Sequence, residues 1–354
     1  MRVFCTGATG FVGAHTALAL LSEGHELRLL VRDEQAARTW FSSRGQRIER
    51  FVTVDIRDQA ALAHAMAGCD AVFHAAAAVS LDRHKARETY DNNVGSTKAV
   101  LGAACSVDIE KLLYVSSVTV LFHPGLPRID ESTPLADVSE PYSRSKRDSD
   151  EYVRELQRRG APVQITYPAG VIGPDDPKLS AVNRALVSLT CQMLPRTTTG
   201  LQVVDVRDLA HAHRWLLEHA PSGDFEDARY IVGGHFYPWA ELREHLEALL
   251  ARRLFSPRVS PAVMRAMGTT ADWAKRLVPL QTQVSAESMA INTRWPYADS
   301  TRFLTKSGMS FRSGDETLSD TIRWLTEAGH IPVKKAGRLA PLSLTPQSER
   351  NDVP

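Results

Sequence analysis

A glycine-rich loop between a short apolar run and a helical pattern is the feature that most constrains the fold. The loop Thr6-Gly7-Ala8-Thr9-Gly10-Phe11-Val12-Gly13 directly follows the apolar run at 2–6. In such a turn Gly7 permits tight bending, Gly10 lets the backbone approach a pyrophosphate, and Gly13 allows the helix to pack on the strand. The helix N-terminus then favours negative charge. The predicted dinucleotide contacts are Gly7, Thr9, Gly10, Phe11, Val12 and Gly13.

Short apolar runs alternate with helical patterns through the first 170 residues. This alternation predicts βαβ units, a parallel sheet, and helices on both of its faces. The expected fold class is therefore α/β with a doubly wound parallel sheet, and together with the glycine loop this predicts a Rossmann domain that binds NAD(P). The expected strands are 2–6, 26–31, 48–54, 71–74, 111–116 and 163–167.

The pattern changes after Pro174, where clusters of Pro and Thr appear. We predict that residues 1–174 plus about 200–236 form the dinucleotide-binding domain. A smaller, mainly helical substrate-binding region would comprise about 175–199 plus 237–331. Residues 332–354 are rich in Pro, Lys, Arg, Ser and Gln, and a mobile tail is predicted there.

Residues 257–296 carry many large apolar side chains in an irregular pattern. They predict a second small hydrophobic core, and the alternative is a lid that faces the substrate. The side chains concerned are Val263, Met264, Met267, Trp273, Val278, Leu280, Met289, Trp295 and Tyr297.

Composition excludes several classes of protein. The 42 Lys and Arg residues against 41 Asp and Glu leave a charge of +1, so no general electrostatic argument favours nucleic acid or an anionic membrane. The four cysteines are never closer than 36 residues, which predicts neither a metal site nor a disulfide framework. No apolar run approaches the roughly 18 residues of a membrane span, and no leader pattern opens the chain. We therefore expect a cytoplasmic protein without an integral membrane segment.

The end of the second expected strand predicts which dinucleotide binds. An acidic residue there accepts hydrogen bonds from the ribose of NAD, whereas arginine pairs with the 2′-phosphate of NADP. Arg32 precedes Asp33, which favours NADP and leaves NAD as the alternative. Asp55 and the amide of Ile56, after the third strand, are placed to meet the adenine. Small residues follow the fourth strand, where the chain would pass close to the cofactor: Ala75, Ala76 and Ala77.

Three polar residues predict the catalytic group. Tyr142 and Lys146 are four residues apart at the start of an expected helix and share one face, and Ser117 stands 25 residues before Tyr142. A phenol titrates near pH 10, but a nearby ammonium group stabilises its phenolate. Lys146 can also bind the nicotinamide ribose, and Ser117 can orient a substrate oxygen. Tyr142 and Lys146 are thus expected to contact both substrate and cofactor.

With these motifs the sequence resembles the extended short-chain dehydrogenase/reductase family over about residues 1–235, and more weakly to near 330. The resemblance implies NAD(P) binding by the glycine loop and catalysis by Ser117, Tyr142 and Lys146. Other matching motifs are Asp55 to Asp58, His74 to Ala77, Asn92-Asn93-Val94, Ser116-Ser117 and Tyr167-Pro168-Ala169-Gly170-Val171-Ile172-Gly173-Pro174.

The same resemblance implies further roles. Asn93 would support the lysine, and the turn at Pro168, Ala169, Gly170 and Val171 would line the nicotinamide end of the site. A homodimer is a family-based expectation. Two positions depart from the pattern: Ser96 stands in place of a Gly, and Tyr167 in place of an Arg.

The turn and Val31-Arg32-Asp33 look most like the dihydroflavonol reductase and 3β-hydroxysteroid dehydrogenase branch. This favours hydride transfer between nicotinamide and a ketone or secondary alcohol on a fairly apolar small molecule, with Tyr142 as general acid and base. One alternative is a nucleotide-sugar epimerase or dehydratase with tightly bound NAD. A second alternative is a dinucleotide-responsive binding protein without chemistry.

Overall fold

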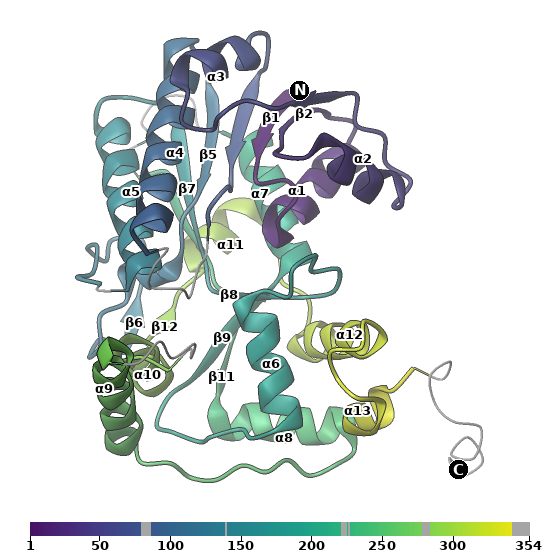
Figure 1. Ribbon diagram of the computed structural model, residues 1–354, viewed down its shortest axis with the longest axis vertical. Helices are drawn as coiled ribbons and strands as arrows, with labels where there is room; N and C mark the ends of the chain where they lie inside the picture. The colour runs from purple at the N-terminus through teal and green to yellow at the C-terminus, as the bar shows by residue number, and fades with distance from the viewer. Residues whose placement is uncertain (79–85, 139, 221–224, 226, 278–283, 342–354) are drawn as a thin grey trace.

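The main feature of the fold, seen in a computed structural model, is a parallel seven-stranded sheet (Figure 1). The structure describes residues 1–78, 86–138, 140–220, 225, 227–277 and 284–341. Strand order runs outward in both directions from the centre, which is the doubly wound Rossmann arrangement and confirms the predicted fold class. In spatial order the strands are β3 (Arg50–Val52), β2 (Glu26–Leu30), β1 (Arg2–Thr6), β4 (Ala71–His74), β5 (Lys111–Val115), β7 (Val163–Pro168) and β10 (Arg229–Val232).

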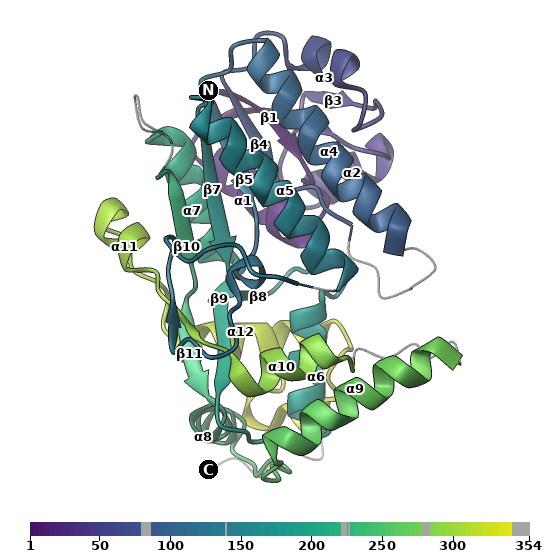
Figure 2. The same cartoon turned by 90° about the vertical axis from the view of Figure 1, so that its left-hand side faces the viewer.

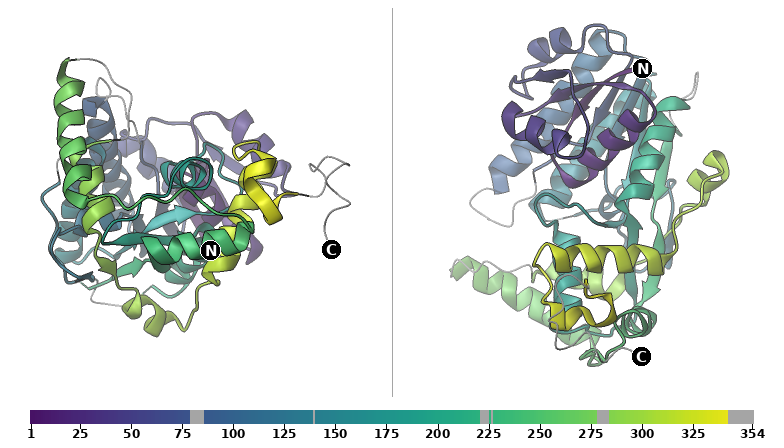
Figure 3. Two further views of the ribbon diagram at one scale, coloured as in Figure 1. Left: turned by 90° about the horizontal axis from the view of Figure 1, so that it is seen from below. Right: turned by 90° about the vertical axis from the view of Figure 1, so that its right-hand side faces the viewer.

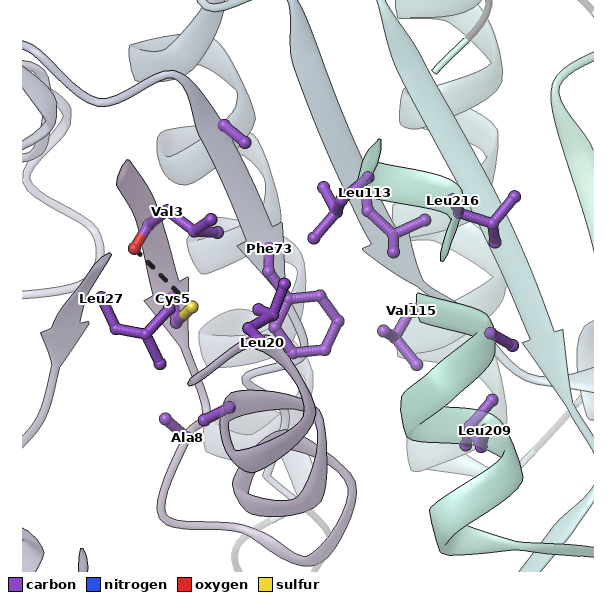
Figure 4. Packing of buried hydrophobic residues seen from close by; sticks show 14 of the residues in the cluster. Val3, Cys5, Ala8, Leu20, Leu27, Phe73, Leu113, Val115, Leu209 and Leu216 are labelled. Carbon is purple, nitrogen blue, oxygen red and sulfur yellow. Dashed lines mark hydrogen bonds between the residues drawn. The ribbon is translucent and has the colours of Figure 1, made fainter. Parts of the chain in front are cut away.

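Helices cover both faces of this sheet, so its strands are apolar on both sides. Val3 and Cys5 of β1 pack toward one layer of helices, and Phe4 packs toward the other. Figure 4 shows the first of these cores, in which Leu20 and Leu209 reach strands from their helices. The first layer is α1 (Phe11–Ser22), α2 (Glu34–Ser42) and α7 (Val206–Glu218), and the second is α3 (Gln59–Met66), α4 (Ala86–Ser106) and α5 (Pro141–Arg158).

The lower part of the molecule in Figure 1 has its own sheet and core. Residues 200–205, expected in the dinucleotide-binding domain, form β9 and pair instead with strands of this second sheet. The region is therefore not purely helical. Its elements are β8 (Gly170–Ile172), β9 (Gly200–Asp205), β11 (His235–Pro238), α6 (Ala181–Cys191), α8 (Trp239–Leu250) and α12 (Gly314–Glu327).

Residues 257–296, read from the sequence as irregular, contain helices α9 (Pro261–Leu277) and α10 (Ala286–Arg294). The second core is built by α8 and α12 rather than by this segment. The prediction of a core from its apolar residues is wrong for four of them, which are exposed: Val263, Met267, Trp273 and Tyr297. Val278 and Leu280 lie outside the described residues.

The predicted mobile tail is wrong for residues 332–341. Helix α13 (Val333–Ala336) and the short helix η3 (Gly337–Leu339) follow α12, and Ala336 and Leu339 are buried in the second core. Gly337 adopts φ +53°, and a Cβ there would lie 1.9 Å from the carbonyl oxygen of Leu250. The backbone of this segment therefore touches α8 directly. Residues 342–354 lie outside the described part of the chain.

Several short elements lie between the Rossmann sheet and the lower region. β6 (Arg128–Ile129) pairs with β12 (Tyr297–Ala298), and η2 (Val118–Leu121) and α11 (Thr301–Ser307) complete the elements. In the left-hand view of Figure 3, α9 (green) lies at one margin of the molecule and the yellow helices near the C-terminus lie toward the other. Among the described helices, none combines the length and the apolar composition that crossing a bilayer requires.

Candidate active site

The glycine loop forms a cradle at the carboxyl end of β1. Gly7 has φ +76°, and a Cβ on it would lie 2.7 Å from the amide nitrogen of Ala76. A Cβ on Gly13 would lie 2.1 Å from the carbonyl oxygen of Gly7. Gly10 caps α1 without any side-chain acceptor, and the first turn holds no acidic residue. Close backbone approach and a helix N-terminus free of competing carboxylates fit the pyrophosphate of a dinucleotide.

The other predicted loop residues lie on this cradle: Thr9 is exposed, while Phe11 and Val12 are half-buried at the start of α1. The Phe11 ring meets His15 edge to face, with centroids 5.5 Å apart. The Nε2 atom of His15 is 3.1 Å from the carbonyl oxygen of Pro174, which links the loop to the end of β8. The loop is thus supported from the neighbouring turn.

Arg32 and Asp33 follow β2 but are engaged differently. The carboxylate of Asp33 caps α2 by accepting a hydrogen bond of 2.9 Å from the amide of Ala36. Arg32 is exposed and has no hydrogen bond or ion pair with any residue that the structure describes. An uncommitted guanidinium beside a carboxylate occupied in capping fits a 2′-phosphate better than a ribose 2′-hydroxyl.

The residues expected to meet the adenine follow β3. Asp55 accepts hydrogen bonds from the amide of Arg57, at 2.9 Å, and from its guanidinium. These bonds hold the pKa of Asp55 below its usual value. Ile56, between them, is half-buried. Asp55 is therefore held in an ionised, oriented state at this edge of the sheet.

The segment after β4 runs directly behind the glycine loop. The amide of Ala75 donates to the carbonyl oxygen of Thr6 at 3.3 Å, and the amide of Ala76 to the hydroxyl of Thr6 at 3.4 Å. The backbone of Ala75 and Ala76 thus lies next to the cradle. Ala75 and Ala76 are half-buried and Ala77 is exposed.

Asn93 of α4 connects this segment with α5. Its amide group exchanges two hydrogen bonds with the backbone of Ala78, at 2.7 and 2.9 Å. It also donates to the Ser145 hydroxyl at 2.9 Å, and Ser145 donates to the carbonyl oxygen of Tyr142. Asn93 therefore supports the helix that carries the tyrosine, and none of its hydrogen bonds with the described residues reaches Lys146.

Ser117 lies two residues beyond β5 and caps η2. Its hydroxyl oxygen accepts from both the amide and the hydroxyl of Thr119, at 3.3 and 2.9 Å. A hydroxyl that accepts twice keeps its own proton free to donate. Thr119 was not singled out from the sequence, although its position two residues after Ser117 is a usable signal.

Tyr142 and Lys146 occupy the first two turns of α5, which begins with Pro141 and so has a preorganised start. The Lys146 ammonium donates a hydrogen bond of 2.8 Å to the carbonyl oxygen of Val115 at the end of β5. This bond ties the face of α5 that carries Lys146 to the strand end that leads to Ser117. Ammonium has three donors, so two remain for a ribose or a substrate.

Burial dominates the titration of these two groups. It raises the pKa of Tyr142 to about 12, so the phenol keeps its proton at neutral pH. It lowers the pKa of Lys146 to about 8, with Asp150 acting in the opposite direction. The stabilisation of the phenolate by Lys146 that the sequence predicts is thus outweighed by burial. A phenol that keeps its proton at neutral pH can donate it, as a general acid does.

The turn Pro168-Ala169-Gly170-Val171 lies at the carboxyl ends of the central strands. The amide of Ala169 donates to the carbonyl oxygen of Val232, and a Cβ on Gly170 would lie 3.0 Å from the carbonyl oxygen of Gln202. The edge of the sheet that carries this turn also carries the glycine loop and Ser117. Ligands of doubly wound sheets bind at this edge.

One contact from the lower region was not foreseen. A carboxylate oxygen of Glu287, at the start of α10, accepts a hydrogen bond of 2.8 Å from the amide of Glu140, which caps α5. A carboxylate at that helix N-terminus is electrostatically favourable. No local signal marks Glu287, because the contact joins residues 147 positions apart. Within the described ranges, no three His, Cys, Asp or Glu side chains gather as metal ligands.

Fold and site together define a dinucleotide-binding Rossmann protein of the extended short-chain dehydrogenase/reductase class. A family model described as the NAD dependent epimerase/dehydratase family matches residues 3–233. The chain belongs to that family.

Similar proteins include reductases. "Putative dihydroflavonol 4-reductase" of Synechocystis sp. is 28% identical over 340 residues, 93% of this chain and 95% of that protein. The 4-hydroxy-2-methyl-3-oxo-4-farnesyl-3,4-dihydroquinoline-1-oxide ketoreductase of Stigmatella aurantiaca is 35% identical over 181 residues, about half of each chain. The crystal structure of gox2253 is 27% identical with a TM-score of 0.77, and covers 93% of this chain and 99% of its own.

Proposed function

We propose that this protein is an NAD(P)-dependent oxidoreductase that interconverts a ketone and a secondary alcohol on a fairly apolar small molecule. The observation that carries the proposal is the bond from Lys146 to the carbonyl oxygen of Val115. It supports a site in which Tyr142, Lys146 and Ser117 act on one substrate oxygen. The glycine loop and the Pro168 turn would hold the dinucleotide on the same edge of the sheet.

The chain's own groups suit carbonyl reduction. When bound, reduced nicotinamide supplies a hydride to the carbonyl carbon. Tyr142 gives its phenolic proton to the carbonyl oxygen, and Ser117 donates a hydrogen bond to that oxygen as charge develops. Lys146 holds the ribose and stabilises the phenolate that remains. Oxidation of the alcohol follows the reverse course.

An apolar substrate is supported by the names of two similar proteins. These are reductases named for a flavonoid and for a farnesylated quinoline. The names favour an aromatic or isoprenoid ketone over a nucleotide sugar.

The test is turnover of a panel of apolar ketones and alcohols, followed at the nicotinamide absorbance. We expect Tyr142→Phe to lower kcat by about 10²- to 10⁴-fold because the proton donor is lost, while cofactor affinity stays within twofold or so. Tyr152→Phe, which removes a phenol from the same helix, is the matched control and should keep wild-type turnover. Equal turnover by wild type and Tyr142→Phe would contradict the proposed role.

A second candidate follows from the family description, which names epimerases and dehydratases. Such an enzyme would retain NAD through purification and would turn over a nucleotide sugar without added reductant. Cofactor release on desalting, together with turnover that needs added NADPH, would exclude it. Retained NAD with nucleotide-sugar turnover would establish it instead.

We further propose NADP as the preferred dinucleotide, because Arg32 is free while Asp33 caps α2. NADPH should therefore raise the melting temperature more than NADH at equal concentration. Stronger stabilisation by NADH would contradict this preference.

A further inference from the structure

Helix α9 has two different faces. One face packs on α10: Met264 is buried, and a Cβ on Gly268 would lie only 2.5 Å from the carbonyl oxygen of Ser285. Asp272 accepts a hydrogen bond of 2.8 Å from the amide of Ala286, at the start of α10. Polar and close contacts on this side fix the helix to the body of the protein, so its opposite side is turned outward. Figure 2 shows α9 reaching away from the rest of the molecule.

The outer face is apolar and exposed. The side chains of Val263, Met267 and Trp273 are 54%, 54% and 64% exposed, and Ala266 and Thr270 between them are exposed as well. These five residues recur at helical spacing and include no charged group. Single exposed apolar residues are common on protein surfaces, whereas a contiguous stripe of large ones marks an interaction surface.

The segment before α9 continues this surface. Phe255 is 69% exposed, and its carbonyl oxygen accepts a hydrogen bond of 3.0 Å from the amide of Leu194, next to the exposed Met193. Arg253 and Arg258 are exposed on either side of Phe255 and form no ion pair with any residue in the described ranges. The exposed ring of Phe255 can insert into an apolar phase. The guanidinium groups of Arg253 and Arg258 beside it can attract anions.

The net charge of residues 251–277 indicates which kind of partner binds this surface. Residues 251–277 contain six Lys and Arg and one Asp, a formal charge of +5, whereas the whole chain carries +1. A two-fold contact between copies would place this segment against itself and bring like charges together. An anionic bilayer instead complements the arginines and takes up the apolar stripe. We infer that residues 251–277 form a peripheral docking surface for the surface of an anionic lipid bilayer.

This inference does not depend on the proposed reaction, because vesicle binding is measured without turnover. The full-length protein is sedimented with vesicles of phosphatidylcholine containing phosphatidylglycerol, and with vesicles of phosphatidylcholine alone, at low and high salt. Wild type should bind the anionic vesicles more tightly, and high salt should weaken this binding by screening. Arg253→Ser with Arg258→Ser should weaken it about fivefold for each arginine removed. Val263→Ser, Met267→Ser and Trp273→Ser combined should weaken it at least about tenfold.

Matched controls remove the same groups elsewhere. Val107→Ser removes another exposed apolar side chain, and Arg158→Ser with Arg159→Ser removes two exposed charges from α5. Both should bind vesicles like wild type, and every variant should keep the wild-type melting temperature. The inference is overturned if wild type does not bind anionic vesicles or binds both vesicle types equally. It is also overturned if the face variants disperse a dimer, or raise KM for a ketone, while vesicle binding stays unchanged.

Discussion

At the scale of single residues, the hydrogen bonds of Tyr167 explain how the protein accommodates a departure from the sequence pattern. Tyr167 stands where relatives of this pattern commonly have an arginine. Its hydroxyl lies in a buried group with Arg154 and Asp150: Arg154 donates to it at 3.0 Å, and it donates to the Asp150 carboxylate at 3.2 Å. The guanidinium that compensates Asp150 comes from α5 itself, one turn along. Asp150 is therefore paired with Arg154 although residue 167 is a tyrosine.

Arg32 and Asp33 allow a paired prediction. Arg32→Ser should weaken NADPH binding roughly 10- to 100-fold by removing a charge-assisted contact with the 2′-phosphate, and should leave NADH binding unchanged. Asp33→Ala should cost about 1 kcal/mol of stability because α2 loses its cap, without altering the preference between dinucleotides. Isothermal titration and thermal unfolding measure the two effects. A loss of NADH binding in Asp33→Ala would instead assign the ribose to that carboxylate.

The lowered pKa of Lys146 predicts pH dependence. As pH rises through about 8, Lys146 loses its proton, so NADPH affinity should fall with an apparent pKa near that value. In the unfolded chain this lysine keeps its proton to higher pH, so its titration makes the folded state more stable as pH rises above 8. The expected loss of NADPH affinity is therefore not caused by unfolding. Titrations of Lys146→Met should lack this transition. An identical transition in that variant would assign it to another group.

At the scale of secondary-structure elements, α5 organises the site. It carries Tyr142 and Lys146 on one face, its start is held by Glu287 of α10, and Asn93 of α4 supports its second turn through Ser145. These hydrogen bonds connect α5 to α10 and to α4. The bond from Lys146 to Val115 also connects α5 to the end of β5.

Helix α1 supplies a prediction with an internal control. Gly13→Ala places a Cβ 2.1 Å from a backbone oxygen, where nothing flexible can yield, so we expect a loss of several kcal/mol and of dinucleotide binding. Gly95→Ala, inside α4, meets only the Arg57 side chain at 3.5 Å and should stabilise the protein by up to about 1 kcal/mol through helix propensity. Denaturant unfolding compares them. Equal stability of both variants would show that α1 can move away from β1.

At the scale of the whole molecule, the described residues form a core on each face of the parallel sheet and a further core, the second core named above for the lower region. The sheet cores are built mainly from residues before 233, and the second core joins Ile172 and Leu186 to α8, α12 and the segment 333–339. The chain crosses between them at β8 and β9 and again after β10. The C-terminal segment consequently belongs to the structure of the lower region.

Leu339 tests that assignment. It is buried against the second core, so Leu339→Ala should destabilise the protein by about 2–5 kcal/mol through lost burial and a cavity. Leu126→Ala makes the same change at a position that is 43% exposed and should cost far less, under about 1 kcal/mol. Thermal unfolding distinguishes the two. A Leu339→Ala protein as stable as wild type would mean that residues 332–341 contribute nothing to this core.

Local pattern by itself determined the Rossmann half of this protein. The strands at 2–6 and 71–74 were predicted at their observed bounds, and the turn glycines at 7 and 13 were identified, because strand periodicity and glycine geometry depend on near neighbours. Tertiary structure alone decided the pairing of β9, the order at 332–341, the exposure of α9 and the bond from Glu287 to α5. Each depends on which distant segment packs against an element, and sequence spacing carries no record of that choice.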